Sequence, residues 1–99
     1  VEQKPEFGGG PQEMMKFIAK NVVYPSICVN NNIQGKVYVT FIIDKRGNVT
    51  NAEIINDGNK YLDKEALRVI SKMPKWKPGK QRGKAVNVKY TIPVNYRLK

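Results

Sequence analysis

The side chains best able to do chemistry lie in one basic stretch, residues 73–84. A single tryptophan, Trp76, stands there among five cations: Lys75, Lys77, Lys80, Arg82 and Lys84. Such cations can contact phosphates and an indole ring can stack on a base, so the stretch first suggests nucleic-acid binding. The chain, however, shows no zinc-finger or helix-turn-helix spacing. Because Pro74 and Pro78 flank the tryptophan, we expect Trp76 to pack back onto the core.

The remaining polar residues do not indicate catalysis. The chain contains no histidine, which is the commonest general base and the commonest metal ligand. Its one cysteine, Cys28, cannot form an internal disulfide and is expected to be a small core residue. Two acids stand beside turn glycines, and two others lie two residues apart on a predicted helix, where side chains do not face each other: Asp44, Asp57, Asp63 and Glu65. We therefore predict a protein that is not an enzyme, with no cofactor and no metal site.

The charge of the chain is unevenly distributed. Residues 60–99 hold twelve Lys/Arg against Asp63 and Glu65, whereas residues 1–59 hold six of each sign, so the second part supplies the whole net charge of +10. Such an electropositive region favours an anionic partner, which leaves nucleic acid, an anionic membrane or cell wall, and an acidic peptide as alternatives. It does not determine the fold.

The organisation of the chain is that of one domain with a lead-in. Its 99 residues suffice for a single core, and no apolar run approaches the roughly 18–20 residues of a membrane span. The triple glycine at 8–10 predicts a flexible lead-in over residues 1–10, followed by a domain at 11–99. The opening at Val1 suggests a domain cut from a longer chain that carries the export signal or membrane anchor.

Two helices are predicted from apolar residues at helical spacing. The first spans about 11–21, with Pro11 at its start, and ends before Pro25; the second spans about 61–73 and is stopped by Pro74. Their inward residues are expected to form the core: Met14, Phe17, Ile18 and Val22 in the first helix, and Leu62, Ala66, Val69, Ile70 and Met73 in the second.

Three strands are predicted from residues of alternating polarity. Residues 36–43 and 49–55 form a hairpin around the turn 44–47, and residues 85–98 form a long final strand with one apolar face. Pro93 lies within that strand, and proline is confined to edge strands or bulges because it cannot donate to a ladder. If Pro93 faces an open edge, then Asn87, Lys89 and Thr91 present unpaired N–H groups to the same side.

The element order predicts an α+β domain. The order is α-β-β-α-β, which gives a three-stranded antiparallel sheet with two helices packed on one face. Several segments, in this order and spacing, resemble the C-terminal domain of the TonB family in the form common among Bacteroidetes-like bacteria. They cover residues 5–98 and comprise the first helix with Tyr24-Pro25, the strand 35–41, the turn 44–47, the helix segment 62–67, the turn 76–79 and the alternating final strand. Each motif is weak alone, whereas the set is specific.

The resemblance implies a binding function. Domains of this family are periplasmic parts of inner-membrane energy transducers, which work with an ExbB/ExbD-type motor and pass force from the proton gradient to outer-membrane transporters. They bind the transporter's TonB box, a short extended peptide, as an added strand. Carried over by position, the pairing strand comprises Val86, Asn87, Val88, Lys89, Tyr90, Thr91 and Ile92, with Pro93 ending the ladder.

A second contact with the transporter is implied near the end of the first helix. The enteric form has a glutamine–proline pair ahead of its tyrosine–proline, and that glutamine touches the transporter plug. Here Asn21 keeps an amide but the proline is missing, while Tyr24 and Pro25 match. These three residues are candidate transporter contacts, although Tyr24 and Pro25 are equally suited to anchoring the chain after the helix.

Alternative functions stay open at this stage. One is a cell-wall or other polyanion-binding module, a second is nucleic-acid binding, and a third is the terminal domain of a membrane-bound sensor peptidase. An open edge strand is also prone to self-pairing, so a homodimer is a further expectation.

Overall fold

Three helices form in the computed structural model, which describes residues 2–99. Helix α1 (Pro11–Asn21) begins on a proline and buries Met14 and Ile18, and α3 (Lys60–Ser71) buries four apolar residues at helical spacing. The side chain of Asn59 caps α3, accepting hydrogen bonds from the N–H groups of Tyr61 (2.9 Å) and Leu62 (3.2 Å). Helix α2 (Ser26–Asn30) was not predicted, because five residues are too few to show a helical period.

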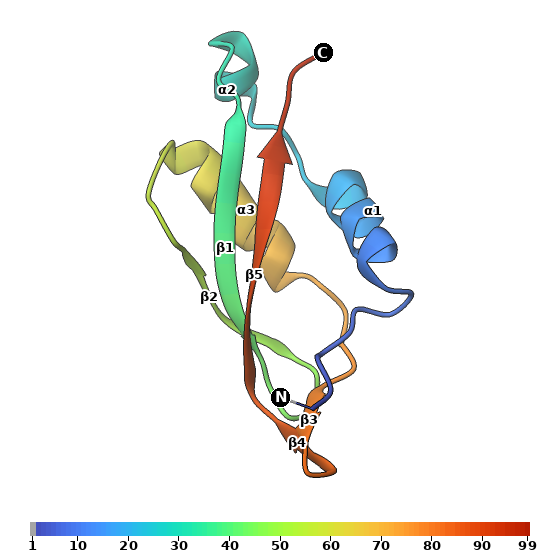
Figure 1. Cartoon of the computed structure of the whole chain (residues 1–99). Coiled ribbons are helices and arrows are strands. Elements are labelled where there is room, and N and C mark those ends of the chain that lie inside the picture. The colour runs from blue at the N-terminus through green and yellow to red at the C-terminus, as the bar shows by residue number, and fades with distance from the viewer. Residues whose placement is uncertain (1) are drawn as a thin grey trace.

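The main sheet contains three antiparallel strands. They are β1 (Gly35–Ile43), β2 (Val49–Ile54) and β5 (Val88–Tyr96), in the spatial order β2-β1-β5. Figure 1 shows β1 between the other two, with α3 behind the sheet and α1 beyond β5. The molecule is elongated, measuring 50 × 25 × 17 Å. Both β2 and β5 are therefore edge strands, and one face of the sheet carries no helix among the described residues.

The core lies between the sheet and the helices. Alternate residues of β1 point into it and are buried: Val37, Val39, Phe41 and Ile43. Ile92, Val94 and Tyr96 of β5 and Leu62, Ala66, Val69 and Ile70 of α3 complete the layer. Cys28 is fully buried in the same cluster, which confirms its predicted role as a core residue. The predicted fold class is thus confirmed, with the short α2 added.

The basic stretch is more regular than the predicted loop. It forms a second hairpin of β3 (Gly79–Gln81) and β4 (Lys84–Val86), joined by Arg82 and Gly83. Both turn residues have positive φ, 52° and 73°, which is the geometry of a type I′ turn. The single final strand predicted over 85–98 is therefore wrong in one respect: Asn87 separates β4 from β5. The alternation of side chains continues across this break, so the pattern could not show it.

Trp76 anchors this hairpin to the core, as expected. The side chain is 4% exposed and packs edge-on against Phe7, Phe41 and Tyr90, with ring centroids 5.1–5.8 Å apart. Its backbone N–H donates to the carbonyl of Gly47 (2.8 Å), in the turn between β1 and β2. A Cβ at Gly47 would lie 2.0 Å from the Trp76 carbonyl oxygen, so only glycine permits this approach.

The segment before α1 makes more contacts than a flexible lead-in predicts. Gln3 bridges to Lys80 and Glu6 to Lys77 in antiparallel fashion, so the segment lies along β3. Phe7 is buried and packs on Phe17 as well as Trp76. The expected division of the chain at residue 10 stays a prediction. Within residues 2–99 no helix has the length and apolar character that crossing a bilayer requires.

Candidate peptide-binding edge

The direction of the backbone groups on β5 follows from the ladder on the other side of β1. Tyr38 accepts a hydrogen bond from the N–H of Ile55 (3.0 Å), so the polar groups of Tyr38 point toward β2. Tyr38 is directly opposite Pro93 in the β1–β5 register. Since antiparallel partners alternate between bonded and non-bonded pairs, Tyr38 and Pro93 form a non-bonded pair. The backbone of Pro93 therefore points away from β1.

The same alternation applies along the whole of β5. Lys89, Thr91 and Asn95 share the parity of Pro93 and also point their backbone groups outward. No strand among residues 2–99 pairs with this side of β5. The open edge consequently offers three N–H donors, because proline lacks one, and four carbonyl acceptors. This is an unfilled ladder, in the geometry that an extended peptide requires.

Five of the seven predicted peptide-binding residues lie in β5, Val88 to Ile92. Lys89 and Thr91 face the open edge, whereas Val88, Tyr90 and Ile92 direct their backbone groups to β1. Val86 belongs to β4 and pairs with Gly79. Asn87 lies between the strands, and its side-chain oxygen accepts a hydrogen bond from the N–H of Lys45 (3.1 Å).

The open edge extends further than the pairing strand that was carried over by position. That Pro93 ends the ladder with a peptide stays a prediction, while β5 itself continues through Pro93 to Tyr96. Asn95 is thus a further edge residue that sequence reasoning missed. The alternation of Val94 and Tyr96, both buried, already extended the predicted strand past Pro93 and is the signal by which Asn95 could have been added to the edge.

The side chains of β5 give its two faces different chemistry. Ile92, Val94 and Tyr96 are buried on the helix side, and Val88 and Tyr90 are half-buried there. On the uncovered face Thr91 donates to the hydroxyl oxygen of Thr40 (3.3 Å), and Thr40 donates to the carbonyl of Tyr90 (3.3 Å). The strand is therefore fixed on both faces while its edge stays unpaired.

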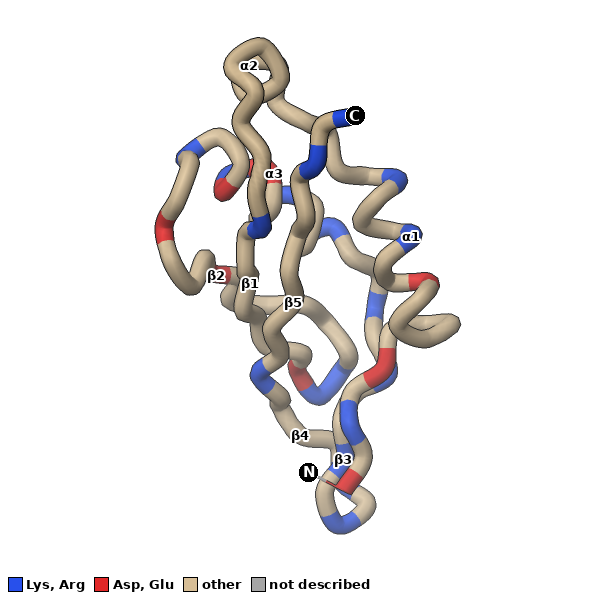
Figure 2. Tube along the Cα trace, turned by 45° about the horizontal axis from the view of Figure 1, so that its top comes forward, with Lys and Arg blue, Asp and Glu red and all other residues tan. Residues whose placement is uncertain are grey.

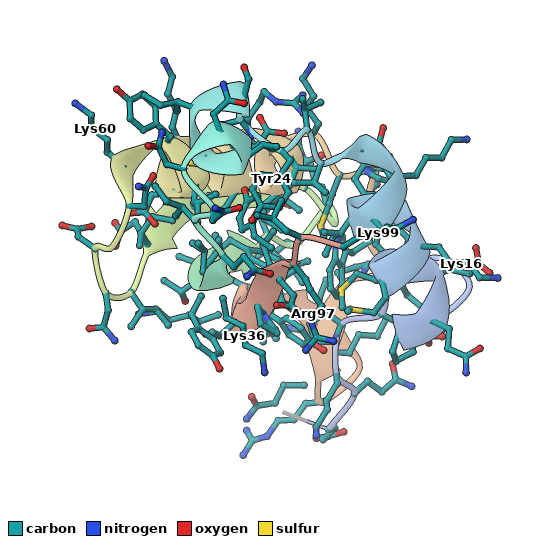
Figure 3. All side chains as sticks on the ribbon, turned by 90° about the horizontal axis from the view of Figure 1, so that it is seen from above. Lys16, Tyr24, Lys36, Lys60, Arg97 and Lys99 are labelled. Atoms are coloured by element: carbon teal, nitrogen blue, oxygen red, sulfur yellow. The ribbon has the colours of Figure 1, made fainter. Side chains whose placement is uncertain are left out.

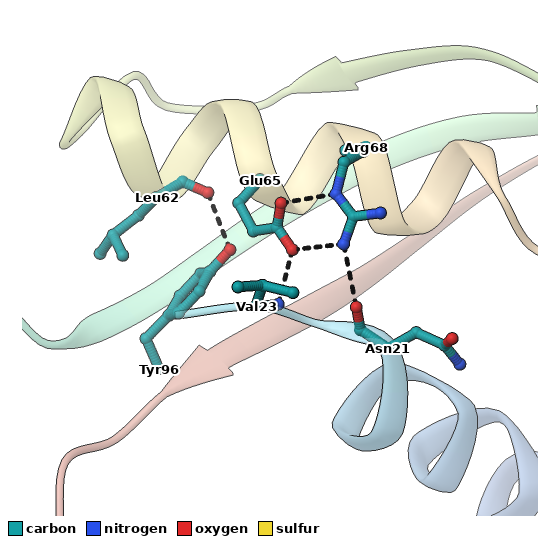
Figure 4. A network of polar contacts seen from close by, with 6 residues as sticks. All are labelled: Asn21, Val23, Leu62, Glu65, Arg68 and Tyr96. Atoms are coloured by element: carbon teal, nitrogen blue, oxygen red, sulfur yellow. Dashed lines mark hydrogen bonds and ion pairs between the residues drawn. The ribbon is translucent and has the colours of Figure 1, made fainter. Parts of the chain in front are cut away.

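A polar network holds the segment between α1 and α2 against α3 (Figure 4). Arg68 donates to both carboxylate oxygens of Glu65 (2.6 and 2.7 Å) and to the carbonyl of Asn21 (2.9 Å). Glu65 also accepts from the N–H of Val23 (2.6 Å). The hydrogen bonds from Arg68 hold the pKa of Glu65 below its ordinary value, so the carboxylate stays ionised in neutral solution.

The three candidate transporter contacts lie in this segment, near the C-terminal end of β5. Asn21 is exposed, and its amide donates to the carbonyl of Phe17 (2.8 Å). The ring of Tyr24 packs edge-on against Tyr96, with centroids 5.4 Å apart, and its hydroxyl donates to the carbonyl of Ile33. Pro25 immediately precedes α2. Tyr24 thus anchors the chain after α1 and Pro25 precedes the start of α2, while contact of all three residues with a transporter stays a prediction.

A shallow pocket of about 320 Å³ lies beside this network. It is mostly apolar and lies between the α1–α2 connection and the outer side of α3, lined by Val23, Pro25, Tyr61, Lys64, Glu65 and Arg68. The tyrosine at the end of β5 closes the other side of the network: Tyr96 donates to the carbonyl of Leu62 (2.9 Å), and burial raises the pKa of its hydroxyl. The C-terminal end of β5 is therefore held firmly by α3.

The cations are spread over the molecule and are not confined to the stretch around the tryptophan. Figure 2 shows Lys and Arg at both ends of the molecule and along α1 and α3. In the basic stretch, the backbones of Lys77 and Lys80 are paired with the segment that carries Glu2 and Glu6, and Glu2 accepts from the N–H of Arg82 (2.9 Å). Trp76 is buried and unable to stack on a base. The described residues also contain no cluster of three side chains suited to a metal ion.

Comparison with known proteins identifies this arrangement. The family model of the Gram-negative bacterial TonB protein C-terminal matches residues 20–98. Two NMR solution structures of the Helicobacter pylori TonB C-terminal domain, covering its residues 194–285 and 179–285, are each 26% identical to this chain with a TM-score of 0.68. Each match covers 89% of this chain. It covers 92% of the structure of residues 194–285 and 79% of the structure of residues 179–285. No curated protein matched the sequence.

Proposed function

The chain belongs to the family of TonB C-terminal domains, and on this basis we propose that its β5 edge binds the TonB box of an outer-membrane transporter by strand addition. Domains of this family are periplasmic, non-enzymatic parts of energy transducers that interact with outer-membrane transporters. Binding at β5 would couple the proton motive force of the inner membrane to import. The observation that carries the proposal is the unpaired ladder of β5.

The energetics of the edge suit a reversible contact. Its seven outward groups allow several backbone hydrogen bonds, each contributing about 1 kcal/mol net. Ordering an extended peptide offsets about 2–5 kcal/mol of this gain. We therefore expect the domain to bind the TonB-box peptide with modest affinity. The α1–α2 connection would add a further contact at the C-terminal end of β5.

The direction of the strand also suits the transmission of force. A peptide paired along β5 and pulled along its own axis loads its hydrogen bonds together rather than one at a time. Beneath it, β5 is paired with β1 over nine consecutive positions, so the load passes into the centre of the sheet. In this proposal an inner-membrane anchor and an ExbB/ExbD-type motor supply the force from a more N-terminal part of the parent protein.

Titration of the labelled domain with a capped TonB-box peptide, followed by amide NMR, tests the proposal. We expect the largest shifts at Lys89, Thr91 and Asn95, whose N–H groups face the edge, and smaller shifts at the residues between them. The affinity should change little between low and moderate salt, because backbone pairing is not ionic. Shifts confined to residues 75–84, with affinity that collapses in salt, would instead establish polyanion binding and overturn the proposal.

A further inference from the structure

A pair of cations lies at the C-terminal end of the open edge. Lys36, near the start of β1, is directly opposite Asn95 of β5, and Arg97 follows Asn95 by two residues. Side chains of this parity lie on the uncovered face of the sheet, and both cations are exposed. Figure 3, which looks down on this end of the molecule, shows Lys36 and Arg97 on the same side.

The backbone around Arg97 is held in place. On one side Tyr96 donates its hydroxyl to the carbonyl of Leu62 (2.9 Å). On the other side the N–H of Leu98 donates to the side-chain oxygen of Gln34 (2.7 Å), just before β1. Arg97 is the first residue after β5, and its place on the side of Lys36 in Figure 3 continues the alternation one residue beyond the buried Tyr96. The backbone on both sides of Arg97 is therefore held in place, and its exposed side chain stands at the end of the edge.

Among the described residues no carboxylate forms an ion pair with Lys36 or Arg97. The ion pairs within residues 2–99 are Lys16 with Glu13 and Arg68 with Glu65. Like charges on neighbouring positions of a sheet are destabilising, and an exposed pair without an acid creates a local positive potential. The other end of the edge differs, because Lys89 and Glu53 line one pocket of about 130 Å³ on the same face.

A peptide added to β5 would bring its own side chains to these cations. It would lie about 4.8 Å from β5, with alternate side chains on the uncovered face. At the end of the edge such a side chain would be a direct neighbour of Arg97. Lys36 would lie roughly 10 Å away, two strand spacings across, and its long side chain can extend over Asn95.

We propose that Arg97 and Lys36 select a carboxylate on the bound peptide. The peptide carries Asp or Glu at the uncovered-face position next to Arg97, and this preference fixes its register on β5. The inference rests on the proposed function, since it concerns the same edge. The position of the preferred acid also shows the direction of the peptide relative to β5. An acid near the N-terminus of the peptide means antiparallel pairing with β5, and an acid near its C-terminus means parallel pairing.

Four capped peptides with one TonB-box core test this proposal. Two carry Asp or Asn at the N-terminal uncovered-face position, and two carry the same choice at the C-terminal position. Affinities are measured by isothermal titration calorimetry for the wild-type domain, for Arg97→Gln, and for Lys60→Gln as a control that removes one charge from the start of α3, across the molecule in Figure 3.

In one pair we expect the Asp peptide to bind about three- to fivefold more tightly than the Asn peptide in low salt, as exposed charge pairs do. Arg97→Gln should remove most of this preference, because only the more distant Lys36 remains, and should leave the affinity for Asn peptides unchanged. Lys60→Gln should keep the preference. Equal affinities for the Asp and Asn peptides in both pairs would overturn this inference but not the proposed function. The inference would also fail if the preference for Asp were lost in Lys89→Gln and kept in Arg97→Gln. If no peptide bound β5, the proposed function itself would fail.

Discussion

The two edges of the sheet, β2 and β5, differ in how they treat an incoming strand. The β1–β2 register shifts between Thr40 and Ile42, because β2 contains an extra residue there. Asn51, in this bulge, has a left-handed φ of 52°. The β1–β5 register, by contrast, runs without interruption over nine pairs. A bulge twists an edge and disrupts its ladder, so β2 resists pairing while β5 permits it.

The β5 edge is protected against pairing with a second copy less strongly than the β2 edge. β5 has no bulge, but Pro93 removes one donor from the centre of its outward ladder and Lys89 adds a charge near its start. These features weaken pairing with a second copy of the same strand and still leave donors on both sides of the proline. These differences lead us to expect strand addition at the β5 edge and not at the β2 edge.

Blocking the remaining donors of β5 should have the largest effect. Thr91→Pro removes the outward N–H next to the one that Pro93 already lacks. It costs no backbone hydrogen bond to β1, and the side-chain bond to Thr40 that it loses is also lost in the control below. We expect TonB-box binding to become undetectable by NMR titration while the spectrum of the folded domain persists. Thr91→Val is the matched control, because it keeps the N–H and the preference for strand; it should bind like the wild type. Unchanged affinity of Thr91→Pro would disprove the edge assignment.

Removing the protection of β2 should produce an intermediate effect. Deleting Asn51 makes β2 match β1 residue for residue, which turns a disrupted edge into a regular one. We expect dimers to appear with rising concentration in sedimentation-velocity experiments. Asn51→Gly, which accepts the left-handed φ and keeps the bulge, should stay at the wild-type association state. A folded deletion variant that sediments like the wild type at every concentration would show that the bulge does not protect the edge.

Loosening the support of β5 should have the smallest effect. Glu65→Gln weakens the network that holds the α1–α2 connection, and with it Tyr24 against Tyr96. At neutral pH we expect the free energy of unfolding to fall by about 1 kcal/mol, measured by urea denaturation. Amide exchange should accelerate at the C-terminal end of β5 and not in β2.

The same variant gives a dependence on pH. Because the folded-state pKa of Glu65 is depressed, its ionised form stabilises the domain above the ordinary value of 4.5, and this contribution is lost as the pH falls through the folded-state pKa. The difference in stability between wild type and Glu65→Gln should therefore shrink below pH 4.5. A difference that is constant down to acidic pH would assign the effect to packing instead of charge.

Residues with a clear period could be predicted from the sequence. The alternation in β1 and β5 and the helical spacing in α1 and α3 gave these elements, and Pro93 indicated the open edge. Phe7 could not be assigned to the core, because one apolar residue among glycines and charges has no period. The break at Asn87 was hidden by alternation on both of its sides. The pairing of Lys36 with Asn95 depends on register between distant strands, which a single sequence does not encode locally.

The small sheet at the β3–β4 end is assembled from parts of the chain that are far apart. Gln3 pairs with Lys80, and Glu2 accepts a hydrogen bond from the N–H of Arg82. Contacts between such distant residues raise the contact order of the fold, because a long loop must close before they contribute any stability. During synthesis they cannot form until residue 82 has left the ribosome. Although they are synthesised first, Glu2, Gln3 and Glu6 are consequently among the last residues to form their hydrogen bonds. Once formed, these bonds place the segment along the outer side of β3.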